Sequence, residues 1–265
     1  MLHRQQHGFF FYGIVMTSKT DRKEKEKKNM SQNMFCFQCE QTAGCTGCTG
    51  NAGVCGKTAR TANLQDELTG ALISLGEAAL KLPDGKRPDN LILEGLFATL
   101  TNVNFDDDVI LDMTARVKKA LKEIRGTETE AYDMQKIWGD DEDIRSLKSL
   151  LLFGIKGMAA YAYHARVLGY SDQEVNHFFC KALNALKKEG TMESLLPLVM
   201  ETGAVNLKCM ELLDQANREC FGEPAPVSVS LTVEKGPFIV ITGHDLEDLK
   251  LLLEQTKDKG INIYT

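Results

Sequence analysis

The chain has 265 residues, of which 43% are hydrophobic and 26% charged, as is typical of a globular protein with one or two domains. Its 31 basic and 37 acidic side chains give a net charge of -6, so no chain-wide positive field exists to attract nucleic acid or anionic membranes. No apolar run approaches the roughly 20 residues of a membrane span. We therefore expect a soluble protein whose partners include neither nucleic acid nor membrane.

Residues 1–33 combine a short apolar patch with the charged run DRKEKEKK and show no periodicity. This composition predicts a disordered extension. The apolar patch, residues 8–16, is short and lacks a small-residue cleavage site, so we do not expect a signal peptide. The folded protein is expected to start near Met34.

Five of the eight cysteines lie close together, at Cys36, Cys39, Cys45, Cys48 and Cys55, in a glycine-rich stretch. This crowding indicates metal or cluster ligation in a reducing cytoplasm rather than a disulfide framework. The two C-x-x-C pairs also suit zinc, although the spacer between them is short for a zinc ribbon or finger. The spacing leaves both options open and favours an iron-sulfur cluster, because a glycine-rich loop offers backbone N–H groups to the sulfides.

Helical periodicity dominates from the cysteines to residue 220, which predicts an all-helical bundle. Acidic residues 106–108 suit a helix start, Gly126 suits a helix stop, and Ser171 with Glu174 matches a capping box. The predicted helices cover residues 63–83, 90–100, 107–125, 143–168, 171–190, 194–201 and 204–218.

The pattern changes after the sequence Glu223-Pro-Ala-Pro. Residues 227–233 alternate like a strand, residues 237–242 and 261–264 are continuous apolar strands, and residues 245–255 form an amphipathic helix between them. We predict a multidomain α and α/β protein: a disordered extension (1–33), a cluster loop with a helical bundle domain (34–222), and the start of a Rossmann-like parallel α/β domain that is cut off (223–265).

Several other residues carry possible chemistry. His244 and Asp245 follow an apolar strand, where α/β sheets place functional groups, but a single histidine is more often structural and Asp245 can simply cap the next helix. Cys180, Cys209 and Cys220 are expected to be buried free cysteines.

The motifs FCFQCEQT, TGC, GVCGKT and TANLQDEL, all between residues 35 and 68, closely resemble the N-terminus of the hybrid-cluster (prismane, hydroxylamine reductase) proteins. The resemblance implies that Cys36, Cys39, Cys48 and Cys55 bind the N-terminal cluster, a 4Fe-4S cubane in one branch of the family, although a two-iron cluster also uses four cysteines. Cys45 is then a loop cysteine or a substitute ligand. The segment GHDL similarly implies that His244 is an iron ligand of the hybrid iron-sulfur-oxygen cluster.

The resemblance also implies an activity, the reduction of hydroxylamine to ammonia and water with nitric oxide as a related substrate. Electrons would come from a flavin and iron-sulfur reductase or a ferredoxin. The other hybrid-cluster ligands of the family correspond to positions after Thr265, so the 265-residue chain is expected to be an inactive fragment. The alternative is a stand-alone iron-sulfur module for electron transfer or sensing.

Overall fold

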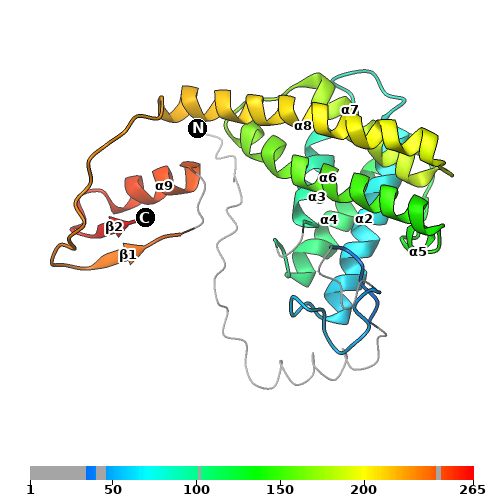
Figure 1. Ribbon diagram of the computed structural model, residues 1–265, viewed down its shortest axis with the longest axis horizontal. Coiled ribbons are helices and arrows are strands. Elements are labelled where there is room, and N and C mark those ends of the chain that lie inside the picture. The colour runs from blue at the N-terminus through cyan, green and yellow to red at the C-terminus, as the bar shows by residue number, and fades with distance from the viewer. Residues whose placement is uncertain (1–33, 40–45, 101–102, 243–245) are drawn as a thin grey trace.

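The computed structural model describes residues 34–39, 46–100, 103–242 and 246–265, which leaves the predicted extension over residues 1–33 outside the described chain. Helices dominate up to residue 221, and a small parallel sheet with one helix follows (Figure 1). Among these residues, no helix combines the length and hydropathy that a membrane span requires. The elements are α2 (Ala59–Ala79), α3 (Asp89–Ala98), α4 (Asp107–Arg125), α5 (Gln135–Trp138), α6 (Glu142–Val167), α7 (Gln173–Lys187), α8 (Met192–Phe221), β1 (Phe238–Val240), α9 (Leu246–Thr256) and β2 (Asn262–Tyr264).

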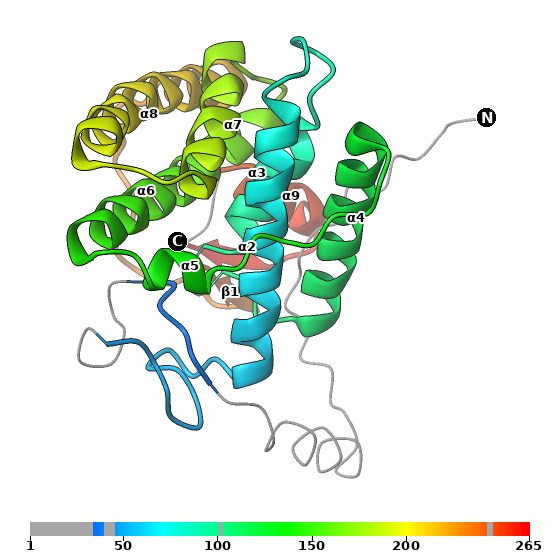
Figure 2. The ribbon, with the colours of Figure 1, turned by 90° about the vertical axis from the view of Figure 1, so that its right-hand side faces the viewer.

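Helix α2 lies between α4 and α7 and packs against both (Figure 2). Leu68, Leu72 and Leu75 have no exposed surface, so this helix supplies much of the apolar core. At Gly70 a Cβ would lie 2.0 Å from the carbonyl oxygen of Tyr132, whose own N–H donates to the Gly70 carbonyl at 3.1 Å. Glycine at this position therefore allows the segment before α5 to lie directly on α2.

The predicted helices agree with α2, α3, α4, α6 and α7 to within a few residues. For α4 both ends match, because the signals are local: the Asp106 carboxylate accepts hydrogen bonds from the N–H groups of Asp108 and Val109, and Gly126 adopts a left-handed conformation with φ of 76°. The expected capping box at α7 is wrong. Asp172, not Ser171, caps that helix by accepting from the N–H groups of Glu174 and Val175.

Helix α8 corrects the prediction of two helices over 194–201 and 204–218, because it runs unbroken from Met192 to Phe221. Gly203 does not interrupt it, and the buried face of Leu195, Leu198, Val205 and Cys209 continues past this glycine. That face packs along α6, so tertiary contact outweighs the low helix propensity of glycine. The short helix α5 was not predicted.

A strand-helix-strand unit follows an extended segment after α8 (Figure 1). Strands β1 and β2 pair in parallel, with Phe238 opposite Asn262 and Val240 opposite Tyr264, and α9 connects them as predicted. The strand predicted over residues 227–233 is wrong: these residues form no strand and are exposed, and no strand of the described part of the chain pairs with them. An extension of β1 and β2 into a Rossmann-like sheet stays a prediction.

Candidate metal centre

The cysteine loop lies at the end of the bundle where α2 begins (Figures 1 and 2). Cys36 and Cys48 sit opposite each other on two antiparallel backbone segments, with hydrogen bonds of 3.0 Å from Cys36 N–H to the Cys48 carbonyl and 2.8 Å in the reverse direction. Residues in such a pair extend their side chains to the same side of the ladder. Both cysteines are buried, so two predicted ligands share one face of the loop.

Cys55 lies in a second turn of the same loop. The Gly53 N–H donates to the Lys57 carbonyl, the Gly56 N–H donates to the Gly53 carbonyl, and Gly56 adopts a positive φ of 84°. A Cβ at Gly53 would lie 3.4 Å from the Cys55 sulfur. The positive φ of Gly56 favours glycine at this position, directly after Cys55.

All four predicted ligands are free thiols: Cys36 and Cys48 are buried, and Cys39 and Cys55 are half-buried. Among the described residues, no three histidine, cysteine or acidic side chains are gathered closely enough to form a metal site. A ligand group of this kind rarely exists before the metal binds, because binding and the final local folding are coupled. The donor set, free thiols in a glycine-rich turn, fits iron-sulfur ligation. Cys45, His244 and Asp245 lie outside the described residues.

Burial raises the pKa of the Cys36 thiol, while a hydrogen bond from the Gln38 N–H and the charge of Lys57 act to lower it. The Gln38 hydrogen bond and the Lys57 charge both favour the thiolate, which is the form that binds metals. The residues that supply them stand within the cysteine motifs, at C-F-Q-C and C-G-K.

Aromatic rings hold the first segment of the loop against the bundle. Phe35 and Phe37 contact Trp138 of α5 with ring centroids 5.2 and 5.1 Å apart, and Phe37 is buried. The Arg145 guanidinium covers the Trp138 ring at 4.7 Å. Helix α5, which sequence periodicity did not reveal, therefore positions the segment that carries Cys36 and Cys39.

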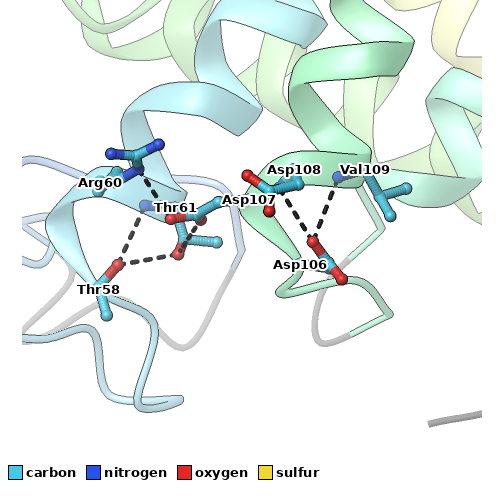
Figure 3. Close-up of polar contacts among 7 residues, drawn as sticks. All are labelled: Thr58, Arg60, Thr61, Asp106, Asp107, Asp108 and Val109. Carbon is cyan, nitrogen blue, oxygen red and sulfur yellow. Dashed lines mark hydrogen bonds and ion pairs between the residues drawn. The ribbon is translucent and has the colours of Figure 1, made fainter. Parts of the chain in front are cut away.

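Hydrogen bonds and an ion pair connect the end of the loop to the N-termini of α2 and α4 (Figure 3). Thr58 caps α2 by accepting from the Thr61 N–H, and the Thr61 hydroxyl donates to Asp107 at 2.8 Å. Arg60 forms an ion pair with Asp107 at 2.9 Å. These contacts fix the start of α2 against the start of α4, and so fix the end of the loop at Thr58, three residues after Cys55.

Hydrogen-bonded polar side chains connect the loop to helix α2. Gln38 accepts from the Lys57 ammonium at 2.7 Å and donates to Asp66 of α2 at 2.5 Å and to the Ala62 carbonyl at 3.0 Å. Lys156, in the middle of α6, is fully buried and donates to the Thr99 carbonyl at 3.2 Å. We call Gln38, Lys57, Asp66 and Lys156 the polar cluster.

The polar cluster contains two lysine side chains and one carboxyl group, and burial shifts the pKa of Lys156 and of Asp66. Burial lowers the pKa of Lys156 to about 8, and the charge of Asp66 counteracts this effect. Burial raises the pKa of Asp66 to about 6, against the hydrogen bond from Gln38 and the charges of Lys156 and Lys57. The sequence analysis did not identify Asp66 or Lys156, although a lysine inside the apolar run LLLFGIKGMAA is a signal that could have revealed the latter.

The other cysteines lie away from the loop. Cys180 and Cys209 are buried, as expected, and burial raises the pKa of these thiols to about 12 and about 11. Cys220 is exposed, which corrects the expectation that it is buried. It belongs to the last turn of α8, where residues 218–220 are all open to solvent.

Residues 34–265 match the model of the prismane/CO dehydrogenase family. The chain belongs to this family. The match begins at Met34, two residues before the first cysteine of the loop, and confirms the resemblance to the hybrid-cluster proteins. Membership of this family supports iron-sulfur binding and an oxidoreductase role.

Curated relatives of this prismane-family chain are named hydroxylamine reductase. The protein from Thermodesulfovibrio yellowstonii is 42% identical over 264 residues, covering 88% of this chain and 48% of that protein. Those from Maridesulfovibrio salexigens and Porphyromonas gingivalis are 40% and 42% identical, with 88% and 89% of this chain and 48% of each relative covered. The chain spans about half the length of the curated relatives it matches, which fits the N-terminal portion that the motifs indicated.

Proposed function

We propose that Cys36, Cys39, Cys48 and Cys55 hold an iron-sulfur cluster and that the chain forms part of an oxidoreductase of the hydroxylamine reductase type. The pairing of Cys36 with Cys48 on opposing backbone segments carries this proposal, because it places two buried thiols on one face of a glycine-rich loop. The prismane-family match and the names of the relatives supply the reaction class.

The loop has the features that such a cofactor requires of a protein. When bound, the cluster supplies one-electron transfer. The Gln38 N–H is directed at the Cys36 sulfur, the kind of hydrogen bond that tunes a ligating thiolate. Phe35 and Phe37 pack on Trp138, which places apolar rings next to Cys36 in the sequence.

For the whole enzyme we propose the reduction of hydroxylamine, in which two electrons and two protons break the N–O bond and give ammonia and water. Nitric oxide is the related substrate, and a flavin and iron-sulfur reductase or a ferredoxin is the proposed electron donor in the cytoplasm. By resemblance to the family, His244 would serve as a ligand of the second, hybrid cluster; it lies outside the described residues.

The test is anaerobic purification of the full chain with iron, sulfide and zinc analysis, followed by EPR after dithionite reduction. We expect iron and sulfide in equal amounts and a reduced-cluster signal, with about four irons per chain for a cubane. Cys48→Ser should lose both the iron and the signal, because it removes a buried ligand.

Two matched variants serve as controls. Cys220→Ser changes an exposed cysteine on α8 and should retain the cluster, and Cys45→Ser should retain it if Cys45 is a loop cysteine. Stoichiometric zinc without iron, or an unchanged cluster in Cys48→Ser, would contradict the assignment.

Hydroxylamine turnover tests the expectation that the 265-residue chain does not complete the reaction by itself. We expect the 265-residue chain to exchange electrons with dithionite without reducing hydroxylamine. Sustained ammonia production by the purified chain, followed with an ammonia assay, would show that the whole reaction needs no more than these residues.

A further inference from the structure

Two buried lysine ammonium groups lie behind the cysteine loop, and the ligand assignment by itself gives them no role. The side chain of Lys57 is 4% exposed and that of Lys156 is 2% exposed. They come from different parts of the fold, Lys57 from the loop itself and Lys156 from the middle of α6. Placing a charged group away from water is costly unless something in the protein compensates for the lost hydration.

The described neighbours of the two lysines compensate only part of this charge. Asp66 is the carboxylate of the polar cluster, and Gln38, which is neutral, connects it to Lys57 through hydrogen bonds of 2.5 and 2.7 Å. Asp133, whose charge also acts on Asp66, is exposed to solvent, so within the polar cluster two ammonium groups face one carboxylate, which leaves an excess of positive charge. Besides Asp66 and Lys57, the groups whose charge acts on Lys156 are Cys36 and Cys39.

The Lys57 ammonium is held at 2.7 Å by Gln38, which stands in the sequence between two of the proposed ligands, Cys36 and Cys39. A cluster held by four thiolates gains one negative charge when it accepts an electron, whether it contains two or four irons. A nearby cation stabilises the more negative, reduced form. The effect is strong here because the lysines are shielded from water, so solvent and salt screen their field only weakly.

We propose that Lys57 and Lys156 form a fixed positive charge behind the cysteine loop that raises the reduction potential of the cluster, and that Asp66 partly offsets this charge. The inference rests on the cluster assignment under Proposed function. The lysines do not bind the metal; they act through the electric field at Cys36 and Cys39 and set how readily the cluster takes an electron from a one-electron donor.

A purely structural role would make a different prediction. Lys156 links α6 to the end of α3 through the Thr99 carbonyl, and Lys57 holds Gln38 in place. If these contacts were the whole role, substitution would change stability and would not shift the potential in a direction set by the sign of the charge removed.

The experiment is a potentiometric titration of the anaerobically purified full chain, with dithionite as reductant and EPR as the readout. Lys156→Met keeps the length of the side chain and removes its charge, so the midpoint potential should become more negative. Asp66→Asn keeps an oxygen that can accept from Gln38 and removes the offsetting negative charge, so the potential should become more positive.

Lys148→Met is the matched control. Lys148 lies on the same helix, eight residues before Lys156, and is 3% exposed, but its ammonium forms an ion pair with Asp140 at 2.7 Å. Its removal should leave the midpoint potential unchanged. A shift in Lys148→Met as large as that in Lys156→Met would overturn the inference.

Iron and sulfide content, measured first, separates failure of the inference from failure of the proposed function. If the unmodified chain binds no cluster, both the proposed function and the inference are wrong. If it binds one and the potentials of Lys156→Met and Asp66→Asn stay unchanged or move in the same direction, only the inference falls. If Lys156→Met does not fold, Asp66→Asn decides alone: a more positive potential supports the inference and any other result overturns it.

Discussion

The helical region (residues 34–222) and the C-terminal region (residues 223–265) both contain regularly spaced apolar side chains, but they differ in how far these side chains are buried. In the helical region Leu72 and Leu183 have no exposed surface. In the described part of the C-terminal region, residues 223–242 and 246–265, no residue is buried, and Leu231 is 97% exposed. An apolar pattern thus stabilises a fold only where another element packs against it.

The first way to test this comparison is a matched pair of leucine truncations, with the largest expected effect. Leu72→Ala should lower the free energy of unfolding by about 3 kcal/mol, because it leaves a cavity in the core. Leu231→Ala should change it by less than about 0.5 kcal/mol, since its side chain already contacts solvent. Urea unfolding followed by far-UV circular dichroism measures both. Equal losses would mean that residues 223–242 pack more closely than the structure shows.

The second test concerns close packing inside the helical region. Gly70→Ala places a Cβ 2.0 Å from the carbonyl oxygen of Tyr132, so backbone must shift and stability should fall by about 2–3 kcal/mol. Gly203→Ala, on the exposed face of α8 with no atom within 4 Å of the added Cβ, should instead raise stability by about 0.5–1 kcal/mol. Thermal unfolding distinguishes the two. Tolerance of alanine at position 70 would contradict the close approach of this segment to α2.

The smallest expected effect is electrostatic and depends on pH. Partial burial of the Glu77 carboxyl raises its pKa, but the hydrogen bond from Lys187 and the charges of Lys187 and Arg125 outweigh it, so the pKa lies below its usual value of 4.5. A depressed pKa stabilises the folded state above pH 4.5, and this stabilisation disappears as the pH falls through the folded-state pKa.

Glu77→Gln should therefore cost about 1 kcal/mol at pH 7, and the difference from the unmodified chain should vanish in acid. Urea unfolding at a series of pH values measures it. The control is Glu247→Gln, which removes the ion pair with Lys250 in the C-terminal region and should leave unfolding of the helical region unchanged at every pH. A constant cost at all pH values in Glu77→Gln would assign the effect to packing instead of charge.

Features encoded in a few consecutive residues were predicted correctly. Both ends of α4 follow from Asp106 and Gly126, and the parallel β1-α9-β2 unit follows from two short apolar runs around an amphipathic one. Apart from the capping residue of α7, the secondary-structure predictions that failed depend on contacts between distant residues. Separate helices were predicted over 194–201 and 204–218 because the packing of the other face of α8 along α6 cannot be seen in the local sequence, and residues 227–233 looked like a strand although no described strand pairs with them.

For the candidate site, the sequence by itself determined which cysteines are proposed as ligands, their spacing, the glycines of the loop and, through whole motifs, the prismane family. The tertiary structure decided which groups surround the ligands. It paired Cys36 with Cys48, placed Trp138 under Phe35 and Phe37, and brought Asp66 and Lys156 from two helices to the back of the loop. The physical reason is that ligand chemistry depends on side-chain identity and local spacing, whereas burial, pairing and electric field depend on which distant segments the core brings together.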